Sequence, residues 1–309
     1  MLTGEVQREE QKKQQSDSTS TSYRQQFGRF GEALGRLRHD KSALAGGAIV
    51  IMFVLTGIAV AISDYLKITI TPYNPLQQNV GRDLEPPSFV HLFGTDQIGR
   101  DVFSRVIAAT PVDLTIGVVV VASSLIVGII VGSFAAYHGG LVDEGLMRLT
   151  DIFFALPALI LAMAISVALG TGAINMMIAL AIIWWPPYAR LARGETLKIA
   201  HQNYVEAAKL SGAGRVRVLL EHIVPNISLT MLVYATLDIG AVILVYSGLS
   251  YLGLGVQAPN PDWGQMVSSL QDYMVTAPWL PLLPGLAIAL IVVGFSLLGD
   301  GIRDALGVH

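Results

Sequence analysis

The sequence contains no cysteine, which excludes disulfides, thiolate metal sites and cysteine nucleophiles. Charged residues are also scarce: they make up 14% of the 309 residues, against about 25% in a typical soluble domain. The net charge of −3 leaves no basic excess of the kind that attracts nucleic acid. With 52% apolar residues and a mean hydropathy of +0.56, the composition excludes a disordered chain and argues against a soluble one. What remains is a polytopic membrane protein.

Several patterns of catalytic residues are missing as well. No Gly-Lys dipeptide occurs, so the chain has no Walker A loop for ATP. There is no His-Glu-x-x-His, and His201 and His222 lack metal-ligand spacing. Residues 253–255 do not complete a dinucleotide fingerprint. The sequence therefore predicts no catalytic residue, no metal site and no cofactor bound by this chain.

Uncharged tracts long enough to cross a bilayer recur along the chain. A bilayer core of ~30 Å needs about 20 apolar residues of helix. Such tracts lie at 43–63, 114–137, 152–189, 239–261 and 273–299. The third is too long for one span, and the glycines near its middle favour a turn, which gives spans near 147–169 and 176–190. The fourth extends back to residue 223 and gives a span near 227–247. We therefore predict an all-α membrane protein with six transmembrane helices.

The placement of Lys and Arg predicts the orientation of these spans. If the N and C termini are cytoplasmic, sixteen Lys and Arg residues lie on the cytoplasmic side of the membrane and four on the outer side. The opposite orientation reverses these numbers, and cytoplasmic segments of membrane proteins carry the excess of Lys and Arg.

The first forty residues differ from the rest. Residues 1–22 are rich in Gln, Ser and charge and lack the apolar segment of a signal peptide, which predicts a disordered cytoplasmic tail. Residues 23–40 place Phe and Leu at helical spacing with Arg on the other face. This pattern predicts an amphipathic interfacial helix on the inner membrane surface. A short helix packed on another protein surface is the alternative.

The outer loop 64–112 is the longest connection between spans. Prolines in its first half favour an extended course. Thr95 or Asp96 is expected to cap a short helix over 100–109. A segment of this size either contacts a soluble partner or covers the spans.

The loop 192–226, which the count of Lys and Arg places on the cytoplasmic side, has a composition typical of helices. We expect a helix over 195–210, a break at 211–214 and a second helix over 215–223 with Val216, Leu219, Leu220 and Ile223 on one side. Pro225 is expected to end it. This describes a helix-turn-helix that protrudes into the cytoplasm, with the small residues of Glu206-Ala207-Ala208 at its centre.

These residues resemble a known motif. Glu206-Ala207-Ala208, followed at fixed distances by Gly212, Ile223 and Pro225, resembles the EAA loop of ABC importer permeases. A Glu-Ala-Ala triplet alone is uninformative, but its place between the fourth and fifth spans is specific. Residues 91–101, 143–157, 249–264 and 299–304 look like stretches of the peptide/nickel permeases. Leu92 departs from the family, which often has Pro there, and the tail falls outside the resemblance.

The resemblance implies a C-type permease subunit of dipeptide/oligopeptide importers, with type I ABC importer architecture and a six-span permease domain over 41–309. It implies a bacterial or archaeal cytoplasmic (plasma) membrane. The expected partners are a second homologous permease subunit, one or two ATPase subunits that hold ATP and Mg, and an extracytoplasmic substrate-binding protein. The chain itself is then not an enzyme. The alternatives are a permease for nickel or another small solute, and an ion-coupled secondary transporter.

By the same resemblance, the 192–226 loop is the coupling loop, and its candidate site residues are Glu206, Ala207, Ala208 and Gly212. Glu206 is expected to meet a basic residue of the ATPase, where loss of one partner costs ~2–5 kcal/mol. The alternative for Glu206 is a solvated position on a helix face. Gly212 is expected to permit the tight turn between the two helices.

Three acidic residues and one tryptophan complete the candidates. Asp238, in the middle of the fifth span, either touches a substrate ammonium, lines the translocation path or hydrogen-bonds within the bundle. Asp262 and Trp263, in the last outer loop, are candidates for contact with the binding protein, and Trp263 also fits an interfacial anchor. Asp151 is expected to pair with Arg148.

Overall fold

The structure is a computed structural model that describes residue 35 and residues 37–307, and within these residues it is helical without a β-strand. The longer helices, in chain order, are α2 (Lys41–Leu66), α3 (Val102–His138), α4 (Gly140–Ala155), α5 (Ala158–Leu169), α6 (Ala173–Ala200), α9 (Val224–Tyr251) and α11 (Trp279–Leu306). The shorter ones are α7 (Asn203–Leu210), α8 (Arg215–Val218) and α10 (Trp263–Leu270). A π-helix, Leu219–Ile223, joins α8 to α9, and a 3-10 helix, Gln271–Tyr273, follows α10.

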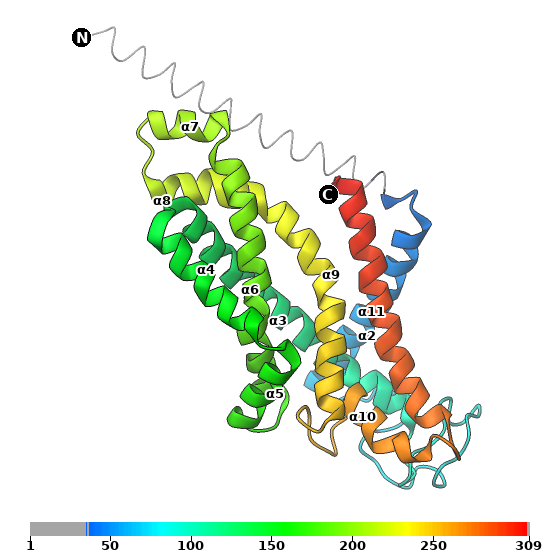
Figure 1. Cartoon of the computed structure of the whole chain (residues 1–309). Coiled ribbons are helices and arrows are strands. Elements are labelled where there is room, and N and C mark those ends of the chain that lie inside the picture. Colours follow the sequence, from blue (N-terminus) through cyan, green and yellow to red (C-terminus); the bar gives the residue numbers. More distant parts are fainter. Residues whose placement is uncertain (1–34, 36, 308–309) are drawn as a thin grey trace.

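The long helices run between two ends of the molecule that differ in structure. One end, called the α7 end below, carries α7 and α8 together with the start of α2 and the end of α11 (Figure 1). The opposite end, called the α10 end, carries α10 and the loop between α2 and α3. The two chain termini of the helical body therefore lie at the same end as α7.

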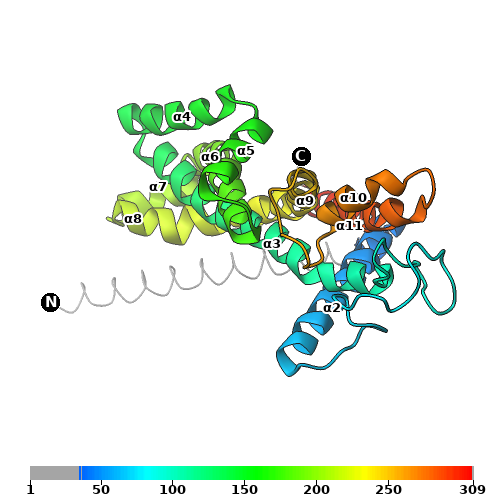
Figure 2. The same cartoon turned by 90° about the horizontal axis from the view of Figure 1, so that it is seen from below.

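The helices surround two apolar cores that share α3. One core is formed by α3, α5, α6 and α9 and includes Val120, Leu180 and Met231. The other is formed by α2, α3, α10 and α11 and includes Phe53 and Trp263. Seen along the bundle, α4 to α8 gather on one side and α2, α10 and α11 on the other, with α3 and α9 between them (Figure 2).

Close contact between α3 and α6 depends on two small residues. A Cβ on Gly128 or Gly132 would overlap the backbone of Tyr188 or Ala189 on α6. Small residues four apart let membrane helices approach to backbone contact, where dispersion forces are strongest. This pair of helices therefore forms the most tightly packed part of the first core.

The helix α3 begins earlier than the sequence suggested. Asp101 caps it by accepting a hydrogen bond from the Ser104 N–H at 2.8 Å, and the helix continues through Pro111. The separate helix expected over 100–109 is therefore wrong. The outer loop expected over 64–112 is shorter, because α2 reaches Leu66 and α3 starts at Val102.

Four helical segments among the described residues are long and apolar enough to cross a membrane: Lys41–Leu66, Val102–His138, Arg215–Tyr251 and Trp279–Leu306. A fifth is counted if α4 and α5, which meet at a 90° bend, form one span. That bend divides the span expected near 147–169 at Pro157, which follows the last residues of α4. The helix α6 does not meet the same criterion, because prolines, tryptophans and charged residues occupy its second half.

The N-terminal predictions are not addressed by the described residues. The tail expected over 1–22 lies outside them, as does nearly all of the interfacial helix expected over 23–40. The described chain becomes helical again at α2, whose N-cap Asp40 accepts hydrogen bonds from the Ser42 N–H at 2.9 Å and the Ser42 hydroxyl. These bonds favour the carboxylate and lower the pKa of Asp40.

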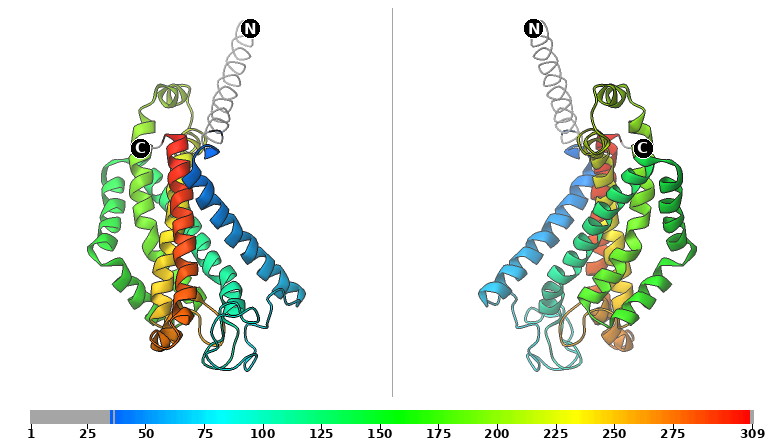
Figure 3. Two further views of the ribbon diagram at one scale, coloured as in Figure 1. Left: turned by 90° about the vertical axis from the view of Figure 1, so that its right-hand side faces the viewer. Right: turned by 90° about the vertical axis from the view of Figure 1, so that its left-hand side faces the viewer.

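The helix α2 diverges from its neighbour α11 along its length. At the α7 end α2 and α11 are in contact, and they separate toward the α10 end (Figure 3). Contact at the α7 end is close because a Cβ on Gly301 would overlap Ala43. Toward the α10 end α2 separates from α11 but stays packed on α3: a Cβ on Gly57 would lie 3.2 Å from Leu114, and Val60 is buried.

Candidate functional site

The segment α7 stands beyond the ends of the long helices at the α7 end (Figures 1 and 3). It is not a continuation of the helix before it: α6 ends at Ala200, and His201 and Gln202 form the turn into α7. The single helix expected over 195–210 is therefore wrong. The turn after α7 contains Gly212, whose φ of +86° a side chain would strain.

The outward side of α7 combines one carboxylate with apolar side chains. Glu206 is exposed, and within the described residues no ion-pair partner contacts its carboxylate. Leu210 is 89% exposed and Tyr204 is 45% exposed. Ala207 is exposed and Ala208 is half-buried. This is a small surface on which a free charge lies beside apolar groups that remain in contact with solvent.

The inward side of α7 is fastened to the bundle. Val205 is fully buried and belongs to the α3–α6–α9 core. The Lys209 ammonium donates to the Ala200 carbonyl at 3.3 Å and lies over the Tyr137 ring. These contacts hold α7 against the ends of α6 and α3, so a displacement of α7 is transmitted to the core.

In the connection from α8 to α9, the residues that face the core are partly different from those predicted. Val218 and Ile223 are fully buried, whereas Val216 is 69% and Leu220 59% exposed. The expected apolar face of 216, 219, 220 and 223 is therefore wrong in part: Ile223 and the half-buried Leu219 pack against the core, whereas Val216 and Leu220 do not. The π-helix Leu219–Ile223 changes the register, and Val218 also faces the core. Pro225 does not end the helix either, because the helical segment runs without a break from Arg215 to Tyr251, with Pro225 just after the π-helical turn.

Ion pairs join α4 to α6 near the α7 end. Arg193 makes two hydrogen bonds of 2.6 Å to the Asp143 carboxylate. Arg190 pairs with Asp151. The expected pair of Asp151 with Arg148 is wrong, since Arg148 instead lies 3.6 Å from Glu144.

Asp238 lies on α9, half-buried, and faces α6. The Trp184 Nε1–H donates to its Oδ2 at 3.3 Å. This contact corresponds to one of the alternatives, a hydrogen bond within the bundle. Contact with a substrate, or a position on the translocation path, stays a prediction.

Asp262 and Trp263 are both fully buried, and this burial argues against direct contact with a soluble partner. The Asp262 carboxylate caps α10 through the Gln265 N–H at 2.9 Å and accepts from the Ser250 hydroxyl at 2.5 Å and from the Tyr246 hydroxyl. The Trp263 Nε1–H donates to the Val106 carbonyl at 2.9 Å. The pair therefore fastens the last loop to α3 and α9, and Trp263 is not an interfacial anchor.

Sequence reasoning missed the charged residues that are buried at the α10 end. Asp96 pairs with Arg100 at 2.6 Å and lies 4.0 Å from Arg105. His91 contacts Asp101 at 2.9 Å. These side chains organise the loop before α3. The signal available in the sequence was the density of charges in 91–105, which is unusual for this chain.

Asp113 was also missed. It is fully buried on α3, its Oδ2 lies 3.4 Å from the Trp263 N–H, and its Oδ1 has no partner among the described atoms. The available signal was a single Asp at the edge of the second span, one residue before the uncharged 114–137 tract.

Two family models match the chain. The model described as "Binding-protein-dependent transport system inner membrane component" matches residues 128–307. The model described as "N-terminal TM domain of oligopeptide transport permease C" matches residues 28–87. Together they match α2, the α7 segment and all later helices, and leave residues 88–127 unmatched.

Curated relatives agree with the family models along most of the chain. A dipeptide transport system permease protein of Alkalihalophilus pseudofirmus is 38% identical over 275 residues, which cover 89% of this chain and 88% of the relative. A di/tripeptide transport system permease protein of Pseudomonas aeruginosa is 40% identical, covering 87% and 88%. A nickel transport system permease protein of Escherichia coli K12 is 39% identical, covering 85% and 93%.

Proposed function

Because the chain belongs to the dipeptide/oligopeptide/nickel family of ABC importer permeases, we propose that it is one of two membrane-spanning subunits of an ATP-driven importer in a bacterial plasma membrane. It carries solute and hydrolyses nothing itself. ATP and Mg belong to separate ATPase subunits, in keeping with the absence of a Walker A loop from this sequence.

We propose six crossings, made by α2, α3, the bent α4–α5 pair, α6, α9 and α11. The α7 end is cytoplasmic in this arrangement and the α10 end is outside. Two observations support it: the start of α2 and the end of α11 lie at the same end as α7 (Figure 1), and that orientation puts sixteen of twenty Lys and Arg on the cytoplasmic side.

The observation that carries the proposal is the surface of α7. A free carboxylate on Glu206 beside exposed Leu210, one helical turn further on, on a helix fastened to the core through Val205, fits a docking surface for another protein. In this proposal Glu206, Ala207 and Ala208 contact an ATPase subunit and Gly212 shapes the turn beside them. Closure of the ATPases then moves α7, and the bundle switches between inward- and outward-facing states as a rigid-body population shift.

Short peptides are the proposed solute. Two of the relatives described above are permeases for dipeptides or tripeptides, and one is a permease for nickel. Nickel or another small solute is the second candidate. The remaining proposed partners are a homologous permease and a substrate-binding protein on the outer side.

The test is purification of this chain from its native membrane in a mild detergent, with mass spectrometry of the proteins that accompany it. We expect a second permease of the same family and at least one ATPase with a Walker A motif. A known ABC importer, solubilised in parallel, shows whether such complexes survive the detergent.

Recovery of the chain alone, while the control importer stays intact, would overturn the proposal. The ion-coupled alternative would then be the one to pursue, with Asp238 as the first residue to replace.

A further inference from the structure

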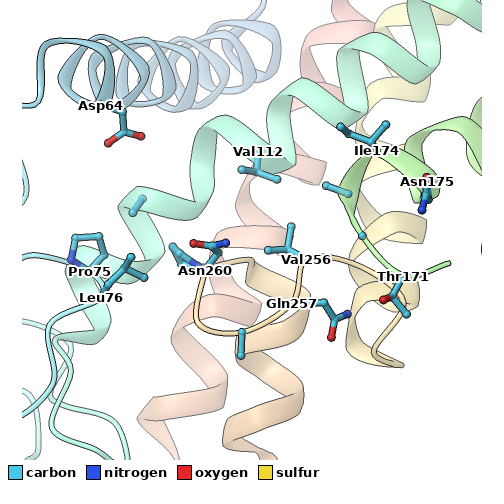
Figure 4. Close-up of a pocket in the computed structure, with 15 residues that line it drawn as sticks. Asp64, Pro75, Leu76, Val112, Thr171, Ile174, Asn175, Val256, Gln257 and Asn260 are labelled. Atoms are coloured by element: carbon cyan, nitrogen blue, oxygen red, sulfur yellow. The ribbon is translucent and has the colours of Figure 1, made fainter.

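A cavity of about 830 Å³ opens at the α10 end, on the inner side of the diverging α2. Its walls come from the last turns of α2, the first half of α3, the turn between α5 and α6, and the loop before α10 (Figure 4). Sites for small molecules are about 300–1,000 Å³. The cavity therefore has the size of a small solute and not of a folded partner.

The polar lining of this cavity consists of one carboxylate and neutral side chains. Asp64 supplies the carboxylate, and it points into the space from α2 (Figure 4). The neutral polar groups are those of Thr171, Asn175, Gln257 and Asn260. No Lys, Arg or His is among the lining residues. The cavity thus offers negative charge to a ligand and no cationic partner.

Two of the three side-chain amides that line the cavity have their nitrogens engaged within the fold. The Asn175 amide nitrogen is engaged by the Leu169 and Gly170 carbonyls, at 2.9 and 3.1 Å. The Gln257 amide nitrogen is engaged by the Gly253 and Gly255 carbonyls. Their carbonyl oxygens remain for other donors. A ligand that donates hydrogen bonds is favoured over one that accepts them.

Two walls of the cavity are held together by one buried arginine. The Arg105 Nη1 donates to the Pro75 carbonyl at 3.0 Å and to the Pro259 carbonyl at 3.3 Å. Pro75 lines one wall, and Pro259 lies between two residues, Ala258 and Asn260, that line the other. The charge of Arg105 is directed at these carbonyls and toward Asp96, not into the cavity. The width of the cavity is therefore set by rigid contacts.

We propose that this cavity receives the solute on the outer side and that Asp64 binds its ammonium group. The ligand class is a small molecule with a free amino group, such as the N-terminus of a short peptide. This proposal deepens the proposed function and rests on it for the direction in which the solute moves.

The same lining disfavours nickel ions and anions. Nickel ions prefer imidazole and other nitrogen ligands, and no His lines the cavity. An anion would find a carboxylate and no positive charge. The cavity therefore favours solutes that carry positive charge and donate hydrogen bonds, before they reach the helical bundle.

The absence of natural cysteine provides a direct test in the assembled importer. Ile174, an exposed apolar residue of the lining, is replaced as Ile174→Cys, with and without Asp64→Asn. Phe89→Cys, on the outer loop away from the cavity, is the matched control. Labelling rates are measured with a trimethylammonium and a sulfonate methanethiosulfonate, each applied from outside and without ATP.

We expect the ratio of cationic to anionic labelling to be roughly threefold higher at 174 than at 89, because Asp64 is the one charged group of the lining and acts across the cavity. Asp64→Asn should bring the ratio at 174 to the control value. Excess alanyl-alanine should slow labelling at 174, whereas N-acetyl-alanyl-alanine and nickel chloride should not.

Equal ratios at 174 and 89, a ratio unchanged by Asp64→Asn, or equal protection by both peptides would each overturn the inference. None of these measurements requires transport or ATP hydrolysis. A failure here therefore leaves the proposed function standing, and a chain that purifies alone leaves the labelling result standing. Asp64 is exposed and makes no side-chain contact within the described residues, so equal membrane abundance of the variants is expected.

Discussion

The two ends of the molecule treat charge in opposite ways. At the α10 end, Asp96, Arg100 and Asp262 are buried and satisfied by other groups of the chain. At the α7 end, Glu206 is exposed and unpaired among the described residues, beside exposed Leu210. Buried charge requires partners within the fold, whereas exposed charge beside apolar surface is available to another protein. The loop before α3 and the turn before α10 are thus a fixed framework, whereas α7 carries the proposed contact surface.

Two glycines, one at each end, also differ in the reason why glycine is needed. Gly212, at the α7 end, has a positive φ and nothing within 4 Å of the position of a Cβ. Gly264, at the α10 end, has no positive φ, but a Cβ there would overlap the Ser247 carbonyl. The first residue is needed for its backbone conformation and the second for close packing of α10 on α9.

The largest effect is expected for Asp96→Asn. It removes the negative charge between two buried arginines, and breaking a buried pair costs about 3–5 kcal/mol. We expect most of the protein to be lost from the membrane, or a large fall in the thermal midpoint of the purified complex followed by tryptophan fluorescence. Asp83→Asn, an exposed position in the same loop, is the control and should have no effect. Normal stability of Asp96→Asn would mean that the α10 end is not held by charge.

Glu206→Ala tests the opposite end. The protein should fold and insert normally, because the side chain has no contact to lose within the described part of the chain. Loss of one partner of a buried interface pair costs about 2–5 kcal/mol, so co-purification of the ATPase and ATP-driven uptake should fall more than about tenfold. Glu144→Ala, an exposed carboxylate on α4, is the control. Full uptake at equal membrane abundance would contradict the coupling role.

Gly264→Ala should destabilise the α10 end by about 1–3 kcal/mol, as overpacking does in a tight contact. The thermal midpoint of the purified complex reports this loss. Gly285→Ala, in α11 with open space around the Cβ position, is the matched control and should be neutral. If both variants behave alike, the packing of α10 on α9 is looser than the backbone contact indicates.

Gly212→Ala should have the smallest effect, about 1–2 kcal/mol of strain from a side chain at positive φ. The global thermal midpoint should hardly change, and ATPase co-purification should weaken moderately. Gly214→Ala, two residues on with φ −63°, should leave both unchanged. An equal loss in the two variants would show that small size, not backbone conformation, matters in this turn.

Much of the fold follows from the sequence because apolar tracts are long and charges are few. The all-helical class and the place of the α7 segment between α6 and α9 are readable from hydropathy and from the Gly212 and Pro225 spacing. The start of α3 is readable in principle, since Asp101 followed by Ser104 is a capping pattern. It was missed because the uncharged tract begins only after Asp113.

Other features depend on tertiary contacts. A helical wheel assumes 3.6 residues per turn, and the π-helix departs from that period, so Val218 is buried beside the half-buried Leu219 while Val216 and Leu220 are exposed. The burial of Asp262 and Trp263 depends on Tyr246, Ser250 and Val106, which are distant in sequence. The cavity depends on the divergence of α2 from α11, and no local pattern encodes the angle between two helices.

The contacts of Arg105 bear on how this protein can be redesigned. Both of its acceptors at the rim of the cavity are main-chain carbonyls, those of Pro75 and Pro259. A main-chain carbonyl is present whatever side chain a position carries, so the spacing of the rim does not constrain the identity of neighbouring lining residues. Exchange of Leu76 or Asn260 is therefore expected to alter solute preference while the frame around them is kept. The shape of the cavity and its selectivity for solutes therefore depend on different groups. Libraries of variants at the lining positions, with Arg105 kept, would exploit that separation.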